Sequence, residues 1–326
     1  MNRLPTLDPH VLTIADLKEA AYYYNEGAMD LITLKDNEAA FNRYKIRPRV
    51  MINVAKIDLE TDIFGIKVNT NCCNGIDQTR LIFQGRRLRL SALAQQLCMD
   101  SHIQMANWQH RAQQQKRTCG TGNPYFMHIS MIKDKVACAN TIKPAGYKAI
   151  FLSVDVPVLG QRLNEHKNKF ELPEGLEWPN LTAVGEGLEY DATIEWHTAI
   201  PWMRSQTKLE IWLKGVASPE DVALAIQHKV DGIMISNHGG RQLDGVPATL
   251  DSLRDCASVA KGKIPIAFDG GGTDMGACWQ QGVELAVKIL MAELRMTMAL
   301  AGCRTVKEIN RGHLAVLKGD GVLCKL

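Results

Sequence analysis

The chain lacks an excess of charge of either sign. Its 326 residues carry 38 Lys plus Arg against 35 Asp plus Glu, a formal net charge of +3. So weak a field does not attract nucleic acid or an anionic membrane as the main partner, although local arginines can still bind a small anion. We therefore expect neither a nucleic-acid partner nor a membrane partner.

Signals for a metal site or a membrane segment are missing as well. The nine cysteines include no Cys-x-x-Cys pair and no Cys/His spacing of a zinc site, so we predict reduced thiols and no metal. No run of 18 apolar residues occurs, and the N-terminal stretch has no charged start followed by an apolar segment. The expectation is a soluble, intracellular protein.

From residue 148 onward, short apolar runs alternate with helix-like segments. Continuous apolar strands between helices indicate a parallel sheet that is covered on both faces. Ser218 and Pro219 are the predicted N-cap and first position of one such helix. Helical spacing at residues 12–24 and 28–43 predicts two further helices before the sheet. The predicted strands span residues 149–154, 209–213, 232–236 and 264–268.

A barrel is favoured over a doubly wound sheet with a dinucleotide site. No Gly-x-Gly-x-x-Gly turn follows any of these strands. Polar residues instead gather where the strands end, as functional residues do in a barrel: Asp155, Lys214, His238 and Asp269. We predict the α/β class, a TIM (β/α)8 barrel with N-terminal helices, formed by residues 1–326 as a single domain.

The segment 236–244, Ser-Asn-His-Gly-Gly-Arg-Gln-Leu-Asp, carries the clearest chemistry. Its histidine is a candidate general base, its arginine is a cation suited to a carboxylate, and its glycines let a ligand approach the backbone. As bare residues, these are explained equally well by a surface loop that happens to contain a histidine and an arginine.

The same nine residues resemble the signature of the FMN-dependent α-hydroxy-acid oxidase and dehydrogenase family, which includes glycolate oxidase and L-lactate oxidase. Further matches follow in the family's order, over both ends and most of the middle of the chain. They lie at residues 23–24, 27–28, 33–34, 37, 47–49, 123–125, 155–160, 214–216, 246–249, 269–271 and 297–300.

The resemblance implies a role for each matching residue. His238 would take the proton of the substrate hydroxyl, and Asp155 would hold the resulting imidazolium. Arg241 and Arg162 would bind the substrate carboxylate, with a hydroxyl contact from Tyr23. Without the resemblance, Asp155 would be interpreted as a helix N-cap.

The resemblance also implies FMN as the cofactor. Lys214 would stabilise negative charge on the reduced ring, and Asp269 would contact the ribityl chain. The side chains of Ser153, Ser236 and His128 would contact the cofactor, and Gly270 and Gly271 would let its phosphate approach the backbone.

The sequence departs from the family where the cofactor would bind. The first two barrel strands are not recognisable in the divergent segment 69–119, and His128 and Ser130 replace the Gln and Tyr of the third strand. Segment 134–145 is short, which predicts little room for a helix. After residue 271 a deletion removes the phosphate-binding arginines and the eighth strand. A decayed or mis-spliced copy and a divergent member both fit these breaks.

We predict FMN-dependent oxidation of an L-2-hydroxy acid to the 2-oxo acid, with O2 reduced to H2O2. The alternative is a catalytically impaired barrel homologue that binds FMN weakly or not at all; transfer of electrons to a protein or quinone acceptor ranks third. The tail Cys324-Lys325-Leu326 is similar to a peroxisomal address, so we expect a peroxisomal or cytoplasmic location. The family resemblance implies a homo-oligomer.

Overall fold

A five-stranded parallel sheet forms the centre of the structure, a computed structural model that describes residues 27–63, 66–68, 126–142, 148–163, 167, 190–270, 280–319 and 321–325. Neighbouring strands follow the order of the chain, and every pair is parallel. The strands are β4 (Phe126–Ser130), β5 (Ala149–Ser153), β6 (Glu210–Val216), β7 (Gly232–Ile235) and β8 (Ile266–Phe268). The predicted parallel sheet is confirmed.

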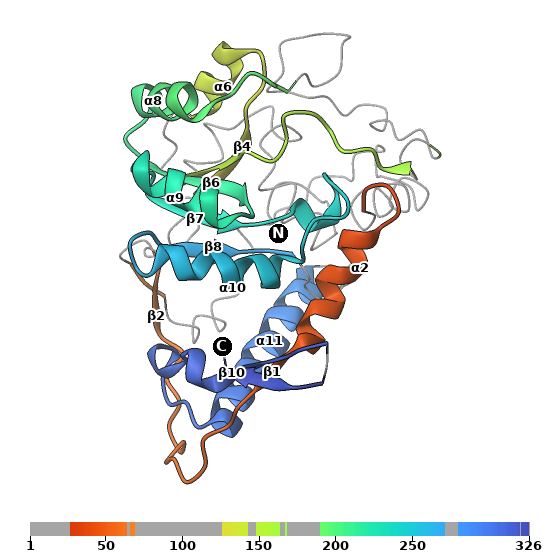
Figure 1. Cartoon of the computed structure of the whole chain (residues 1–326). Coiled ribbons are helices and arrows are strands. Elements are labelled where there is room, and N and C mark those ends of the chain that lie inside the picture. Colours follow the sequence, from red (N-terminus) through yellow and green to blue (C-terminus); the bar gives the residue numbers. More distant parts are fainter. Residues whose placement is uncertain are drawn as a thin grey trace, which may run out of the picture.

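A helix follows each of the first four strands before the next strand begins, as a succession of β/α units requires (Figure 1). Ser218 caps one of them by accepting a hydrogen bond from the Asp221 backbone N–H, which confirms the predicted N-cap. The short segment after β4 does contain an eight-residue helix, so the prediction of little room there is wrong. These helices are α6 (Lys135–Ile142), α8 (Trp196–Gln206), α9 (Pro219–Gln227) and α10 (Thr249–Ala260).

The two faces of the sheet bury different side chains. On one face Leu152, Leu213 and Ile233 pack with residues of the covering helices such as Met203 and Val222. On the other face the rings of Phe151 and Trp212 stack at 5.2 Å, beside Ala149 and Met234. Because side chains alternate along a strand, the next position on this second face is polar in several strands.

The remaining described elements precede or follow this sheet in the sequence, except η3, which lies between β7 and α10. Helix α2 (Ile32–Ala39) and the 3-10 turn η1 (Ala40–Arg43) lead into β1 (Tyr44–Ile46), which pairs with β9 (Leu314–Leu317); β9 also pairs with β10 (Leu323–Lys325). The others are the hairpin β2 (Thr61–Ile63) and β3 (Ile66–Val68), η3 (His238–Gly240), the 22-residue helix α11 (Gln280–Ala301), η4 (Val306–Glu308) and η5 (Arg311–His313).

Helix α2 begins at Ile32, four residues after the start of the predicted helix 28–43. Its first turn is capped by a distant side chain, because the Asp244 carboxylate accepts from the backbone N–H groups of Asp30, Ile32 and Thr33. Such a carboxylate satisfies donors that the helix leaves unpaired. The beginning of this helix is therefore fixed by tertiary structure.

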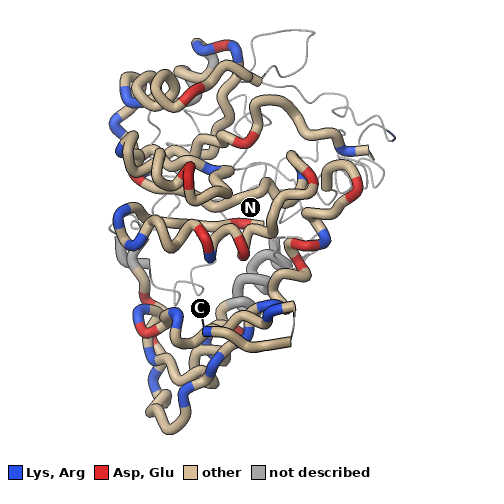
Figure 2. Tube along the Cα trace, viewed as in Figure 1, with Lys and Arg blue, Asp and Glu red and all other residues tan. Residues whose placement is uncertain are grey.

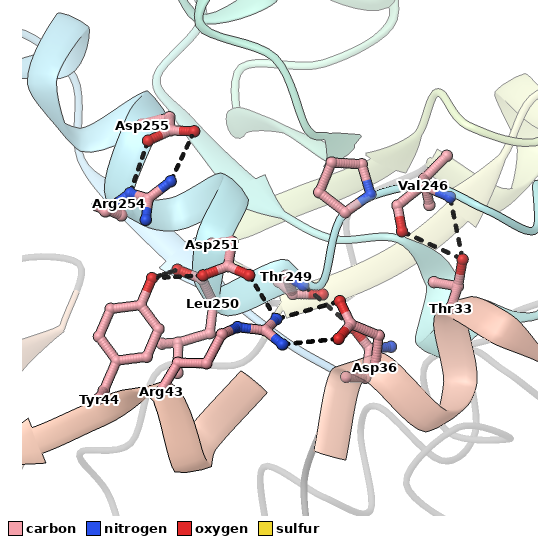
Figure 3. A network of polar contacts seen from close by, with 12 residues as sticks. Thr33, Asp36, Arg43, Tyr44, Val246, Thr249, Leu250, Asp251, Arg254 and Asp255 are labelled. Atoms are coloured by element: carbon pink, nitrogen blue, oxygen red, sulfur yellow. Dashed lines mark hydrogen bonds and ion pairs between the residues drawn. The ribbon is translucent and has the colours of Figure 1, made fainter. Parts of the chain in front are cut away.

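A polar network ties this N-terminal region to α10 (Figure 3). Arg43 contacts both oxygens of Asp36, at 2.8 and 3.1 Å, and Asp251 of α10 at 2.5 Å. The Tyr44 hydroxyl lies 2.7 Å from the same Asp251. Hydrogen bonding to Arg43 holds the pKa of Asp36 below its ordinary value. The contacts join segments more than 200 residues apart in the sequence.

Several predicted features lie outside the described residues: the helix 12–24, the divergent segment 69–119 and the segment 271–279 that follows the predicted deletion. Between β8 and α11 the described residues contain no strand. Basic and acidic residues are interspersed along the described chain (Figure 2). No described helix is long and apolar enough to cross a bilayer.

The first prediction concerns the helix-covered face. Leu213 is only 1% exposed, so Leu213→Ala should lower the free energy of unfolding by about 2–5 kcal/mol through lost burial and a residual cavity. Leu300→Ala, at a site 72% exposed on α11, is the matched control and should change it by less than about 0.5 kcal/mol. Urea denaturation measures both, and equal effects would contradict this assignment of the core.

Candidate active site

Polar side chains meet at the carboxyl edge of the parallel sheet. Ser153 ends β5 directly opposite Lys214 of β6. The buried Lys214 amine donates to Ser236 Oγ at 2.9 Å and forms an ion pair with Asp269 Oδ2 at 3.1 Å. Ser236 and Asp269 directly follow β7 and β8. The sheet thus brings together four of the predicted cofactor-binding residues.

The neighbouring strand β4 adds an imidazole to this edge. His128 Nε2 lies 2.5 Å from Ser153 Oγ, and both side chains are buried. Ser130, also buried, stands opposite Ser153 in the register. His128 therefore occupies the polar side of the sheet with Ser153, as expected for a residue that replaces a hydrogen-bonding Gln.

The predicted base and its carboxylate are in contact. His238 Nδ1 lies 3.1 Å from Asp155 Oδ2 and 3.2 Å from Oδ1. An ionised carboxylate only accepts hydrogen bonds, so Nδ1 carries the proton and Nε2 is left as the basic nitrogen. This arrangement of carboxylate and imidazole is the one that supports a general base.

Electrostatics keep this pair in the protonation state that a base requires. Burial, followed by the positive charge of Lys214, sets the pKa of His238 below its ordinary value despite the opposing effect of Asp155. Burial raises the pKa of the Asp155 carboxyl, but the interaction with His238 and the charge of Lys214 outweigh it and the pKa is lowered. His238 is therefore neutral, and Asp155 ionised, at neutral pH.

The backbone packs closely against the side chain of Asp155 and has an unusual conformation at His238. Strand β6 has an irregular register between Lys214 and Val216, and Gly215 between them has φ 103°. A Cβ on Gly215 would lie 2.4 Å from Asp155 Cγ, so the carboxylate needs a glycine at that position. His238 itself has φ 57°, a conformation that few residues other than glycine adopt.

The two predicted substrate-binding arginines come from different loops and lie side by side. Arg241 and Arg162 are 5% and 3% exposed, and Arg162 Nε donates to the Arg241 backbone carbonyl at 3.2 Å. Part of the donor capacity of Arg162 therefore serves the loop after β7. A guanidinium has five N–H donors, so this contact does not use all of them.

The site also contains polar residues to which sequence reasoning gave no role. The amides of Asn37 and Asn237 donate to each other at 2.9 and 2.7 Å, and Gln242 bridges the loops after β5 and β7. Asp244 caps α2, as described above. In the sequence, Asn37 and the signature residues are matches to the family without a role of their own. The one indication of a role is that a polar residue inside a folded protein needs hydrogen-bond partners.

Two predicted residues, Tyr23 and Gly271, lie outside the described residues. Gly270, which is described, has φ 89°, and a Cβ there would come within 2.7 Å of Thr249 Oγ1. Asp269 Oδ1 is buried without a hydrogen-bond partner, although Oδ2 of the same side chain contacts Lys214. A buried acceptor of this kind is satisfied when a ligand hydroxyl reaches it.

Comparisons with known proteins agree on one family. The sequence pattern of the FMN-dependent dehydrogenase family matches residues 16–275 and 273–316. The chain is 39% identical to "Oxidase FUB9" of Fusarium oxysporum f. sp. lycopersici, over 97% of this chain and 94% of that protein. It is 34% identical to "2-Hydroxyacid oxidase 1" of Mus musculus, over 93% and 94% of the two chains.

Two further matches extend these findings. "Peroxisomal (S)-2-hydroxyacid oxidase GLO3" of Arabidopsis thaliana is 33% identical, over 90% of both chains. Among solved structures, the flavin-binding domain of baker's yeast flavocytochrome b2 superposes with a TM-score of 0.71 at 25% identity, covering 91% of this chain and 82% of that one.

The chain belongs to the FMN-dependent dehydrogenase family. Its fold is the α/β barrel of that family and its cofactor is FMN, which confirms the predicted fold class and cofactor. The residues at the carboxyl edge fit this group, because Lys214 and the Ser153 and Ser236 hydroxyls can donate to a ring and Asp269 Oδ1 can accept from a ribityl hydroxyl.

The pKa of His238 generates the second prediction. Because the folded pKa lies below the ordinary value of 6.5, the unfolded chain binds a proton first, and the free energy of unfolding should fall as the pH drops below about 6.5. His238→Gln should remove this contribution. Asp155, whose pKa lies below 3.8, does not titrate in that range.

Urea denaturation at about pH 7.5 and 5.5 measures the effect as a difference between two proteins. His197→Gln serves as the control, since the His197 side chain is 72% exposed. It should keep the pH dependence of the unaltered chain. An unchanged pH dependence in His238→Gln would contradict a buried, neutral imidazole.

Proposed function

We propose that this chain oxidises an L-2-hydroxy acid to the corresponding 2-oxo acid and that dioxygen is the second acceptor. The observation that carries the proposal is the contact of His238 with Asp155 at 3.1 Å, on a loop that also holds Arg241. A base and a carboxylate-binding cation on one loop match the two functional groups of a hydroxy acid. The names of two relatives, both hydroxyacid oxidases, support this substrate class.

Each residue has a defined task in the proposed reaction. Arg241, with Arg162 beside it, binds the substrate carboxylate, and neutral His238 takes the hydroxyl proton at Nε2. Asp155 then stabilises the imidazolium through Nδ1. Bound FMN supplies the two-electron acceptor chemistry. In the complete cycle the hydroxy acid loses two electrons and two protons, and dioxygen gains both to become hydrogen peroxide.

The size of the substrate is a further part of the proposal. Ser130 lies on the polar face of the sheet, where the family resemblance implies a Tyr, and is itself buried. A smaller side chain leaves more room beside the substrate. We therefore propose that the pocket accepts side chains longer than those of glycolate and L-lactate as well.

A catalytically impaired homologue is the second candidate, and the comparisons give it specific support. The family pattern matches in two pieces that meet at residues 273–275, where the phosphate-binding arginines are predicted to be missing. The alignment with the Fusarium oxidase spans 376 positions, so at least 50 of them have no counterpart in a chain of 326 residues. Loss of cationic donors there would weaken FMN binding.

The location proposed is the peroxisome. The Arabidopsis relative is named as peroxisomal, and the tail of this chain is similar to the Ser-Lys-Leu address. Cys324 and Lys325 belong to β10, which pairs with β9. A receptor that reads an extended tail has to compete with this pairing. The proposed homo-oligomer rests on the family resemblance alone.

The third prediction separates the two candidates by the visible absorption of the purified protein. An active oxidase should show a flavin spectrum that bleaches on anaerobic addition of L-lactate, glycolate or a longer 2-hydroxy acid, and should form peroxide once air is admitted. A colourless protein that FMN cannot reconstitute would overturn the oxidase proposal and favour the impaired homologue.

The fourth prediction tests the assigned residues in that assay. His238→Ala should keep the flavin spectrum but lose bleaching, because removal of a general base slows the reaction about 10²–10⁴-fold. Arg241→Lys should raise KM, because an ammonium replaces a bidentate guanidinium. His197→Ala, at an exposed position, is the control and should bleach normally. Bleaching of His238→Ala at the parent rate would refute the mechanism.

A further inference from the structure

We propose that Gln242 is a positioning residue, whose side-chain amide fixes the loop carrying Asp155 and Arg162 against the loop carrying His238 and Arg241. The inference rests on the proposed function, since it gives a part in that reaction to a residue that has no contact with the reacting atoms. Gln242 belongs to the loop after β7 and is only 9% exposed.

Both the nitrogen and the oxygen of the Gln242 side-chain amide form hydrogen bonds with the loop after β5. Its Nε2 donates to the backbone carbonyls of Asp155 at 3.1 Å and Val158 at 2.9 Å. Its Oε1 accepts from the Gly160 N–H at 3.1 Å and from Arg162 Nη2 at 3.5 Å. An amide has two donors and two acceptor positions, so one side chain engages the loop from Asp155 to Arg162.

The loop needs such a partner because no regular structure supports it. Residues 154–162 belong to neither a helix nor a strand. Backbone groups that are shielded from water outside such elements must be paired in another way, and Gln242 pairs three partly buried backbone groups of this loop. The amide thus supplies hydrogen bonds to the backbone of this loop, as a neighbouring strand does within a sheet.

The two loops also touch through their backbones. A Cβ on Gly160 would lie 2.5 Å from the Arg241 carbonyl oxygen and 2.6 Å from that of Gln242. The backbone of the first loop therefore passes directly over the residues that follow His238. A shift of either loop alters the distance from Asp155 to His238 and from Arg162 to Arg241 together.

This coupling distinguishes positioning from mere packing. Asp155 acts on His238 across 3.1 Å, and misplacement of a catalytic group by about 1 Å can cost on the order of a hundredfold in rate. The charged groups that act on His238 are Asp155, Lys214 and Arg241. Only Asp155 among them has a backbone held by Gln242.

The test replaces the amide with a neutral side chain of similar length, Gln242→Met, in the full-length chain. NMR titration of His238, identified by comparison with His238→Gln, should give a lower pKa than in the unaltered chain. The reason is that Asp155 raises that pKa, whereas Lys214 and Arg241 lower it and remain in place. Gln161→Met, at an exposed neighbouring position, is the matched control and should leave the titration unchanged.

Steady-state kinetics provide the second measurement. Gln242→Met should lower kcat through Asp155 and raise KM through Arg162, with kcat/KM reduced about tenfold to a hundredfold. Gln161→Met should match the unaltered protein. A purely structural role would lower stability without moving the His238 titration, and that result would overturn the proposal.

Two further outcomes are decided by the same design. If Gln242→Met does not fold, Gln242→Asn takes its place, since it keeps an amide that is too short to reach all four partners; an unchanged His238 titration there also refutes the proposal. If the unaltered chain oxidises no hydroxy acid, the proposed function fails, whereas the titration still decides the role of Gln242.

Discussion

The parallel register of β5, β6 and β7 is the constraint on which the site depends. In a parallel sheet all carboxyl ends lie at one edge, so residues that are far apart in the sequence come together there without any specific long-range motif. Ser153 stands opposite Lys214, and Lys214 reaches Ser236 and Asp269. The apolar stack of Phe151 and Trp212 fills the same face one step earlier along the strands.

Strand geometry places the residues that end each strand, but it leaves the loops beyond them undetermined. His238 and Asp155 both lie past the ends of their strands, and their contact depends on how two irregular loops are held. The structure holds them with side-chain amides and carboxylates: Gln242 toward the loop after β5, and Asn237 and Asp244 toward α2. Buried polar networks of this kind stabilise one conformation only when every member is satisfied.

Some elements could be predicted from the sequence and others could not, for physical reasons. β5, β7 and the Ser218 cap follow from local patterns, since apolar runs and capping act over a few residues. The start of α2 could not be predicted, because its capping carboxylate, Asp244, lies 211 residues from Thr33. The length of segment 134–145 is a poor guide to α6, because eight residues are enough for about two helical turns.

The same distinction applies to the site. The roles of His238, Asp155 and Lys214 could be predicted from the family resemblance, whereas residue type and a position at a strand end alone left Asp155 open to interpretation as a helix N-cap. The role of Gln242 could not, since it depends on the distance between two loops that no local pattern encodes. Tyr23 and Gly271 stay predictions, as both lie outside the described residues.

The contacts that hold His238 and Asp155 bear on how the family signature should be interpreted. Within the described part of the chain, the contacts that hold His238 and Asp155 come from residues within 27–37, 155–162, 214–216 and 236–249. The surviving signature therefore accounts for the contact between His238 and Asp155, whereas the residues that fit FMN include others beyond it, such as Ser153 and Asp269.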